Sequence, residues 1–400
     1  MDYNTNKTEK RDVPRALMLA SVASMIDLFN RENVELLQLL GYKVDVAANF
    51  SHGSITSQER VDVFKKELEG QGIEVYNIPI PRSLVKVKEI INSYHSIKKI
   101  VNRNRYDIVH CHSPIGGVLC RLACRTARRK GTKVIYTAHG FHFYKGAKFR
   151  AWLLYYPAER ICSRWTDILI TINSEDYMAA RNFNTCKVKY VAGIGIDTNK
   201  YTKVDRRVIR TEYGLADDDF VFASTGQLSK RKNHKVVIQA LDMLYNSEKG
   251  RTCDKNIKYL VIGFGEKEEE LKQLVSEKNL DDKVVFAGYQ SGVREILSSV
   301  DAFVFPSIQE GLPVALMEAM AEGLPIVASK IRGNVDLIEN EKSGYLVDYN
   351  APEQFADAML KIVNGDNSQM RAREVEKIKA FDKNVVNACM KNIYKEVTQI

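Results

Sequence analysis

The loop GQLSKRKNH carries three adjacent cations, Lys230, Arg231 and Lys232. It follows the apolar run FVFAST, so we expect a strand to end there and a helix to begin. Free N–H groups at a helix start, combined with cations, form a good seat for a diphosphate. An exposed basic turn would have the same composition, so the loop alone leaves both interpretations open.

Two glutamates frame the segment EGLPVALME, at Glu310 and Glu318. Pro313 suits a first helical position, which would leave the N–H groups around Gly311 and Leu312 free. Each carboxylate can accept hydrogen bonds from two neighbouring sugar hydroxyls. A helix with ordinary solvated glutamates is the alternative, and the presence of two favours sugar recognition.

The loop GFGEKEEEL contains Gly263 and Gly265, which would permit close backbone approach to a ligand. Four acids follow at once and would repel a diphosphate, although they complement a helix dipole. We therefore favour a turn here over a ligand contact. The acids are Glu266, Glu268, Glu269 and Glu270.

Four histidines raise the question of a zinc site. His110 and His112 alternate on one expected strand face, and His139 and His142 stand in a neighbouring loop. Their spacing matches no common metal motif. We expect the strand histidines to be neutral, hydrogen-bonded core groups, and no metal site.

Apolar runs that alternate with helical patterns must position these loops. Continuous apolar strands separated by helices indicate parallel sheets covered on both faces, and ligands of such sheets bind at the carboxyl ends of the strands. The expected strands are 16–21, 43–48, 75–80, 107–112, 133–138, 167–172, 187–193, 220–225, 258–263, 283–288, 302–307, 325–329 and 344–348.

The fold class that follows is α/β, with two Rossmann-like parallel-sheet domains facing a cleft. We place the domains at 1–200 and 201–400, joined by a polar linker at 194–207. A last helix at about 385–398 could pack on its own domain or cross back to the first. No G-x-G-x-x-G motif follows the first strand, which argues against an NAD or FAD dehydrogenase.

Charge is divided unevenly along the chain, whose formal net charge is +9. Residues 1–200 carry 31 Lys and Arg against 19 Asp and Glu, whereas residues 201–400 carry 28 against 31. The basic half could be a solvated face that keeps the protein soluble, but the difference in sign between the halves favours an anionic partner, either nucleic acid, an anionic bilayer or a phosphorylated acceptor. Seven cysteines without a CxxC pair fit a reducing cytoplasm.

A basic amphipathic pattern runs through GGVLCRLACRTARRKG at 116–131. Such a helix could lie on an anionic bilayer, or it could be a packed helix with a basic outer face. Its arginines are the candidate acceptor or membrane face. They are Arg121, Arg125, Arg128 and Arg129.

Several motifs together resemble glycosyltransferase family 4, whose members are retaining enzymes with the GT-B fold. The segment EGLPVALME matches the E-x7-E motif of that family. GQLSKRKN, VIGFGE, VVFAGY, DAFVFPS and IRGNVDLIENEKSGYLVD extend the match over nearly all of the second half. DIVHCHSP and VIYTAHGFHFYKG are similar to bacterial exopolysaccharide and capsule members.

The resemblance implies a role for each matching residue. Lys232 would neutralise the donor diphosphate, Glu310 would hold the donor sugar, and Glu318 would bind the ribose hydroxyls. His139 would face the reacting sugar from the first domain, so the catalytic set is His139, Lys232 and Glu310. The implied donor-binding residues are Gly226, Arg231, Lys232, Gly265, Glu310, Gly311, Leu312 and Glu318.

Two positions depart from the family pattern. Gln227 stands where members usually have arginine, so one phosphate contact is either missing or supplied by Arg231 or Lys230. Ser24 and Met25 stand where many members place a pair of glycines.

The function we expect is transfer of a hexosyl or N-acetylhexosaminyl group, with retention, from a nucleotide sugar, UDP favoured. The acceptor would be polyprenyl-pyrophosphate-linked or a saccharide, in exopolysaccharide or capsule synthesis. We expect no metal or other cofactor, no nucleic-acid partner, and a cytoplasmic protein held peripherally on the inner face of the cell membrane. The alternatives are a GT-B sugar-nucleotide epimerase and a non-catalytic, basic nucleic-acid-binding protein.

Overall fold

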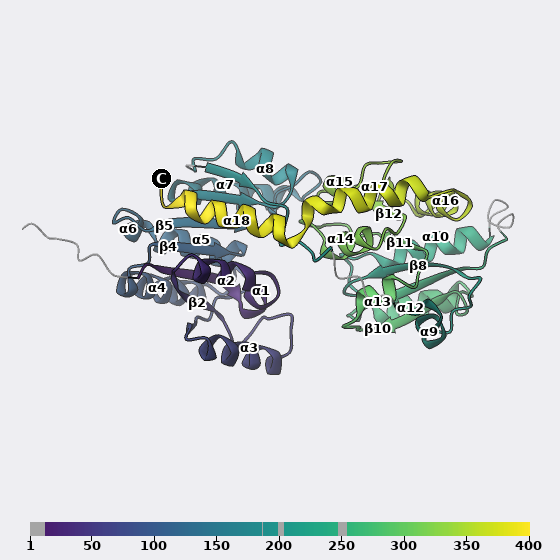
Figure 1. Cartoon of the computed structure of the whole chain (residues 1–400), viewed down its shortest axis with the longest axis horizontal. Helices are drawn as coiled ribbons and strands as arrows, with labels where there is room; N and C mark the ends of the chain where they lie inside the picture. The colour runs from purple at the N-terminus through teal and green to yellow at the C-terminus, as the bar shows by residue number, and fades with distance from the viewer. Residues whose placement is uncertain (1–12, 186, 199–203, 247–253) are drawn as a thin grey trace, which may run out of the picture. The chain divides into compact units, whose positions relative to one another are not determined.

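The computed structural model describes residues 13–185, 187–198, 204–246 and 254–400 (Figure 1). Each expected apolar run overlaps a strand of one of two parallel sheets, and the overlap is smallest at 75–80, where the strand ends at Asn77. This confirms the predicted parallel α/β architecture. Within the described residues, no helix is both long enough and apolar enough to span a bilayer.

Two compact units make up the chain. The first runs up to Ile194 and also includes Val386–Ile400, and the second is Gly195–Val385. The first boundary thus lies a few residues before the expected division at 200. The last helix, α18 (Lys383–Val397), begins in the second unit and contributes most of its length to the first.

The sheet of the first unit has seven strands in the order β3-β2-β1-β4-β5-β6-β7. The strands are β1 (Arg15–Val22), β2 (Lys43–Asn49), β3 (Glu74–Asn77), β4 (Ile108–His112), β5 (Lys133–Ala138), β6 (Ile168–Thr171) and β7 (Lys187–Tyr190). Its helices, besides α18, are α1 (Ala23–Phe29), α2 (Arg31–Leu39), α3 (Gln58–Gly70), α4 (Val87–Asn104), α5 (Pro114–Ala123), α6 (Arg125–Arg128), α7 (Phe149–Cys162) and α8 (Ser174–Ala180), with a 3-10 turn at Ser163–Trp165.

The sheet of the second unit has six strands in the order β10-β9-β8-β11-β12-β13. The strands are β8 (Phe220–Thr225), β9 (Ile257–Ile262), β10 (Val284–Gly288), β11 (Ala302–Phe305), β12 (Ile326–Ser329) and β13 (Tyr345–Val347). The helices are α9 (Arg206–Glu212), α10 (His234–Asn246), α12 (Glu268–Glu277), α13 (Val293–Leu297), α14 (Val314–Ala321), α15 (Asn334–Leu337), α16 (Pro352–Asn364) and α17 (Ser368–Ile378), with a 3-10 turn at Lys379–Phe381.

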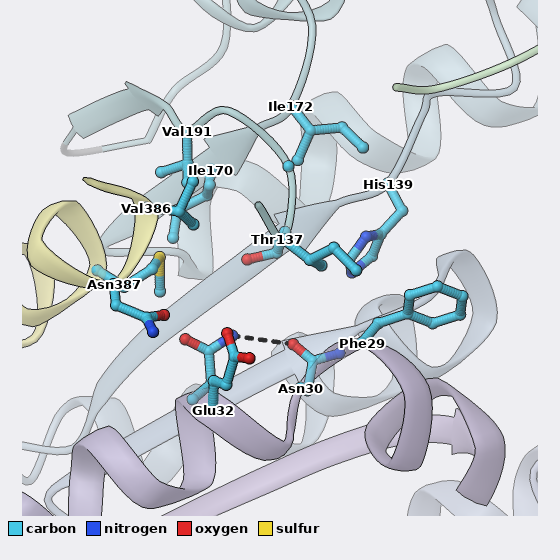
Figure 2. A pocket seen from close by; sticks show the side chains of 14 residues that line it. Phe29, Asn30, Glu32, Thr137, His139, Ile170, Ile172, Val191, Val386 and Asn387 are labelled. Carbon is cyan, nitrogen blue, oxygen red and sulfur yellow. Dashed lines mark hydrogen bonds between the residues drawn. The ribbon is translucent and has the colours of Figure 1, made fainter. Parts of the chain in front are cut away.

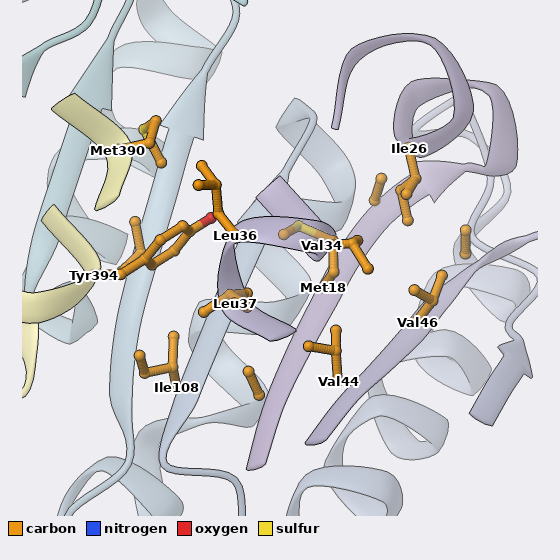
Figure 3. Packing of buried hydrophobic residues seen from close by; sticks show 14 of the residues in the cluster. Met18, Ile26, Val34, Leu36, Leu37, Val44, Val46, Ile108, Met390 and Tyr394 are labelled. Carbon is orange, nitrogen blue, oxygen red and sulfur yellow. The ribbon is translucent and has the colours of Figure 1, made fainter. Parts of the chain in front are cut away.

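Helix α18 packs on the sheet of the first unit because its apolar face continues that core. Met390 and Tyr394 belong to the same buried cluster as Met18 and Ile108 of the strands (Figure 3). The Tyr394 hydroxyl also bonds Nδ1 of His110 at 2.8 Å. The end of the chain is therefore part of the first core.

Candidate functional site

Two loops of the second unit meet because their strands are neighbours. β8 and β11 pair in parallel, so the loops after Thr225 and after Phe305 leave the same edge of the sheet. The Ile308 N–H donates to the Arg231 carbonyl at 2.8 Å. Asn233 donates from Nδ2 to the carbonyls of Pro306 and, at 2.8 Å, Tyr349. These bonds fix the cationic loop against the Glu310 loop.

Glu310 accepts from two cations through a single oxygen. Its Oε1 lies 2.9 Å from Nζ of Lys232 and 2.8 Å from Nη1 of Arg231. Arg231 donates a further bond to the Gln309 carbonyl, and Arg332 donates from Nε to the Glu310 carbonyl at 3.1 Å. Two side-chain cations thus meet one carboxylate, which leaves local positive charge for an anionic ligand.

Lys232 is largely buried, and this burial is the main cause of the lowered pKa of its ammonium group. Desolvation lowers the pKa of the Lys232 ammonium and Arg231 lowers it further, whereas Glu310 acts in the opposite direction. Nζ also lies 4.6 Å from the centre of the Phe305 ring. The Glu310 carboxylate thus does not fully offset the cost of burying the Lys232 ammonium. Further negative charge nearby, such as that of a diphosphate, would stabilise its charged form.

Glycines at two neighbouring strand ends are explained by backbone packing. A Cβ on Gly263 would lie 2.0 Å from the Gly226 carbonyl oxygen, and one on Gly265 would lie 2.4 Å from that of Leu228. Gly226 and Gly263 also have positive φ values of 144° and 143°. No larger residue fits at Gly263 or Gly265, so the preference for a turn has a physical reason. A donor contact by Gly226 or Gly265 stays a prediction.

Helix α14 places Glu318 in its second turn. Pro313 is the N-cap, one residue before the helix, so its predicted first helical position is wrong by one residue. Glu318 is half-buried, and burial raises the pKa of its carboxyl, opposed by Arg294 and assisted by Glu322. Gly311 and Leu312 precede the helix, and a Cβ on Gly333 would come within 2.3 Å of the Gly311 carbonyl oxygen.

Sequence reasoning missed an aromatic pair at the same sheet edge. Phe264 follows β9 and Tyr289 follows β10, and these two strands are neighbours. The two rings lie edge to face, with their centroids 5.9 Å apart. Phe264 is 60% exposed and Tyr289 is 72% exposed. The available signal was an aromatic residue within two positions of the end of each of two adjacent strands. Exposed aromatic rings at the edge of a sheet can stack on a nucleobase.

His139 belongs to a chain of imidazoles in the first unit. Its Nε2 lies 3.1 Å from Nδ1 of His112, and His110 bonds both Tyr394 and Thr137 at 2.8 Å. Burial lowers the pKa of His139 to about 4 and that of His110 to about 3, and it holds the pKa of His112 well below 6.5. His110 and His112 are therefore the neutral, hydrogen-bonded core groups that were predicted.

A small pocket adjoins His139, lined also by Asn30, Thr137 and Asn387 (Figure 2). Its volume of about 30 Å³ has room for about two water molecules. His142 lies apart from the chain of imidazoles, against Tyr155. Among the residues with described positions, no three His, Cys, Asp or Glu side chains gather as a metal site.

The proposed membrane arginines do not act alike. Arg121 is fully buried, 2.7 Å from Glu159 and with its guanidinium 3.9 Å from the Tyr136 ring centre, so its assignment to an outer face is wrong. The buried Glu159 carboxylate supplies the opposite charge that allows the Arg121 guanidinium to be buried.

The other three arginines lie on or near α6. Arg128 forms two bonds to Asp167, at 3.0 and 2.8 Å, and is half-buried. Arg125 and Arg129 are exposed, and Arg125 stacks over Trp165 at 4.5 Å. Of the four, Arg125 and Arg129 keep the predicted exposure. The expected helix is also interrupted at Cys124, between α5 and α6.

Family comparisons match both units. Residues 205–379 match the family model described as "Glycosyl transferases group 1". Residues 21–173 match the model described as "Glycosyl transferase 4-like".

Two glycosyltransferases of known sequence are similar to this chain over most of its length. The chain is 35% identical over 347 residues to the putative glycosyltransferase EpsD of Bacillus subtilis (strain 168), covering 86% of this chain and 85% of that protein. It is 31% identical over 290 residues to the UDP-Gal:alpha-D-GlcNAc-diphosphoundecaprenol alpha-1,3-galactosyltransferase of Escherichia coli, covering 70% and 72% respectively.

Among solved structures, Anabaena Alr3699/HepE in complex with UDP-glucose aligns with a TM-score of 0.73 at 18% identity. That alignment covers 95% of this chain and 99% of the other. Sucrose-phosphate synthase from Thermosynechococcus elongatus aligns with a TM-score of 0.72 at 17% identity, covering 96% and 99%. These two likenesses show the fold.

Proposed function

We propose substrates and a reaction for this chain from the premise that it belongs to the group 1 glycosyltransferases, enzymes of the GT-B fold. It transfers a hexosyl or N-acetylhexosaminyl group from a UDP-sugar to a lipid-linked or saccharide acceptor, in the synthesis of exopolysaccharide or capsule. The observation that carries this proposal is the pair of cations, Lys232 and Arg231, on one oxygen of Glu310.

The donor diphosphate occupies the loop between β8 and α10. Its oxygens attract Lys232 and Arg231 away from Glu310, whose carboxylate then accepts hydrogen bonds from the donor sugar. Arg231 supplies the phosphate contact that Gln227 cannot. Glu318 holds the ribose, and the exposed rings of Phe264 and Tyr289 contact the base. The solved relative that binds UDP-glucose and the relative named for UDP-Gal support uridine.

Transfer proceeds with retention at the anomeric carbon. The bond from that carbon to the diphosphate oxygen breaks, and a bond to the acceptor hydroxyl oxygen forms on the same face. The hydroxyl proton passes to the departing phosphate. Lys232 stabilises the negative charge that grows on the leaving group, so the reaction needs no metal cofactor.

A diphosphate-linked polyprenol is the acceptor we favour. The Escherichia coli relative is named for a diphosphoundecaprenol-linked acceptor, and the relatives AmsK of Erwinia amylovora and WcaL of Escherichia coli are named for amylovoran and colanic acid synthesis. The excess of basic residues in 1–200 supports an anionic partner. The enzyme would work in the cytoplasm, held peripherally at the inner membrane face, with Arg125 and Arg129 available there.

Calorimetry with UDP, GDP and ADP tests the donor assignment. We expect UDP to bind most tightly, and the Lys232→Ala and Glu318→Ala variants to bind it more weakly than the parent chain does. Equal affinity for the three diphosphates would refute the choice of uridine. Failure of every diphosphate to bind would refute the site.

A further inference from the structure

Helix α7 of the first unit exposes an unusual amount of apolar surface. Phe149 is 78% exposed and Leu153 is 67% exposed. They share one side of the helix with further exposed apolar and basic residues at spacings of three, four and seven. The exposed residues of α7 and the turn after it are Phe149, Arg150, Trp152, Leu153, Leu154, Pro157, Arg160, Ile161 and Arg164, and we call them the α7 face.

The charge on the α7 face has one sign. From Phe143 to Thr166 the chain has five basic residues, because Lys145 and Lys148 in the preceding loop join the three arginines. The single acid in that stretch is Glu159, which is buried and paired with Arg121 at 2.7 Å. Interleaved apolar and basic residues without acids are the pattern of a helix that lies in a membrane interface.

The exposed residues stand on a firmly packed base. Phe143, Trp152 and Tyr156 contact one another with ring centroids 5.2 to 5.9 Å apart, and Phe183 joins Phe143 and Tyr156. Glu159 anchors the buried side of the helix to Arg121 and accepts a bond from Tyr136 at 3.0 Å. The apolar side chains are therefore presented outward by a fixed helix, and their exposure is not a consequence of loose packing.

We propose that the α7 face binds the surface of an anionic bilayer, with Phe149, Leu153 and Leu154 among the acyl chains and the arginines among the phosphates. A second copy of the chain fits this face less well, since it would bring three arginines against three. The inference rests on the proposed function, because a bilayer contact serves an enzyme whose acceptor is lipid-linked.

The position of α7 suits that role. The loop 140–148 runs directly from His139 to the start of α7. It is fixed to the helix by ring contacts of His142 with Tyr155 at 4.5 Å and of Phe143 with Trp152 at 5.4 Å. A bilayer held at the α7 face would thus keep the diphosphate of a lipid acceptor close to the loop that carries His139.

Vesicle co-sedimentation of the full chain tests the proposal, with phosphatidylglycerol mixed with phosphatidylcholine and with phosphatidylcholine alone. We expect Phe149→Ala/Leu153→Ala to weaken binding to the mixed vesicles about 100-fold. Arg150→Gln/Arg160→Gln should weaken it about 30-fold and reduce its salt dependence. The matched controls, Val85→Ala/Val87→Ala and Lys99→Gln/Arg103→Gln, change exposed residues elsewhere in the first unit and should bind like the parent chain.

Trp152 offers a direct measure of insertion. The chain has two tryptophans, so Trp165→Phe leaves Trp152 as the one fluorophore of its kind. Its emission should shift to shorter wavelength on anionic vesicles and be quenched by lipids brominated on the acyl chains. An unchanged spectrum, or losses as large in the controls as in the α7 variants, would overturn the proposal.

Measurements of UDP binding distinguish a failure of the membrane proposal from a failure of the proposed glycosyltransferase function. The α7 variants should bind UDP, and glycosylate a short water-soluble acceptor, as well as the parent chain does. Absence of vesicle binding by a parent chain that transfers sugar would refute the α7 face alone. Failure of the parent chain to bind UDP would refute the proposed function instead.

Discussion

The ammonium of Lys232 lies 2.9 Å from Oε1 of Glu310, across the ends of two neighbouring parallel strands. The residues are far apart in sequence, and their contact joins the expected diphosphate seat to the expected sugar seat. Under the proposed function, the donor diphosphate competes with Glu310 for the Lys232 ammonium.

Lys232→Ala should lower kcat about 100-fold or more, because charge on the leaving diphosphate is greatest in the transition state. Lys230→Ala is the matched control, since Lys230 is exposed on the same loop. Its replacement should lower kcat less than about threefold. Steady-state kinetics with saturating donor measures both. A larger loss for Lys230→Ala would show that the wrong cation of the loop had been assigned.

Glu318→Ala should weaken UDP binding about 10- to 100-fold through loss of hydrogen bonds to a carboxylate. The protein should stay folded, because burial raises the pKa of the Glu318 carboxyl and its ionised form thus opposes folding. Glu322→Ala, one turn further along, is the control, since Glu322 pairs with Arg294 at 3.3 Å. Calorimetry measures the affinity for UDP, and thermal unfolding shows whether the variant is folded. Unchanged UDP affinity in Glu318→Ala would refute the assignment of Glu318 to the ribose.

Activity should persist in excess chelator. Under the proposed function, Lys232 and Arg231 supply the cationic charge at the diphosphate that a divalent ion would otherwise supply. Transfer rates with EDTA and with added magnesium or manganese should agree. Loss of activity in EDTA that either metal restores would contradict this account.

The free energy of unfolding should fall as the pH is lowered from neutral to about 5. The unfolded chain protonates His110, His112 and His139 below about pH 6.5, whereas burial keeps them neutral in the fold down to about pH 4 or lower. Each contributes a slope of up to about 1.4 kcal/mol per pH unit.

Chemical denaturation of His139→Gln measures its share of that slope. The variant should show a smaller pH dependence than the parent chain. His95→Gln, which changes an exposed histidine of α4, should leave the slope unchanged. Equal slopes in all three proteins would contradict the burial argument.

Sequence predicted the two sheets well, because continuous apolar runs such as 220–225 are a local signal of a buried parallel strand. It also predicted that the loops after Thr225 and Phe305 leave the sheet at one edge, since strand order alone brings them there. These are properties of short segments and of the fold class.

Burial decided by distant partners could not be predicted. Arg121 has the pattern of a surface arginine, and its inward turn depends on Glu159, which lies 38 residues away. Leu153 has the pattern of a core residue, and its exposure depends on which side of α7 finds partners. Nor does any pattern in the first half reveal that α18 completes that core.

The most direct test of the central claim is a transfer assay with a panel of UDP-hexoses and UDP-N-acetylhexosamines and a diphosphoundecaprenol-linked monosaccharide as acceptor. We predict release of UDP with formation of one new glycosidic bond that keeps the anomeric configuration of the donor sugar, and strong impairment in Lys232→Ala and Glu310→Gln. A product of inverted configuration, or full activity in both variants, would contradict the account.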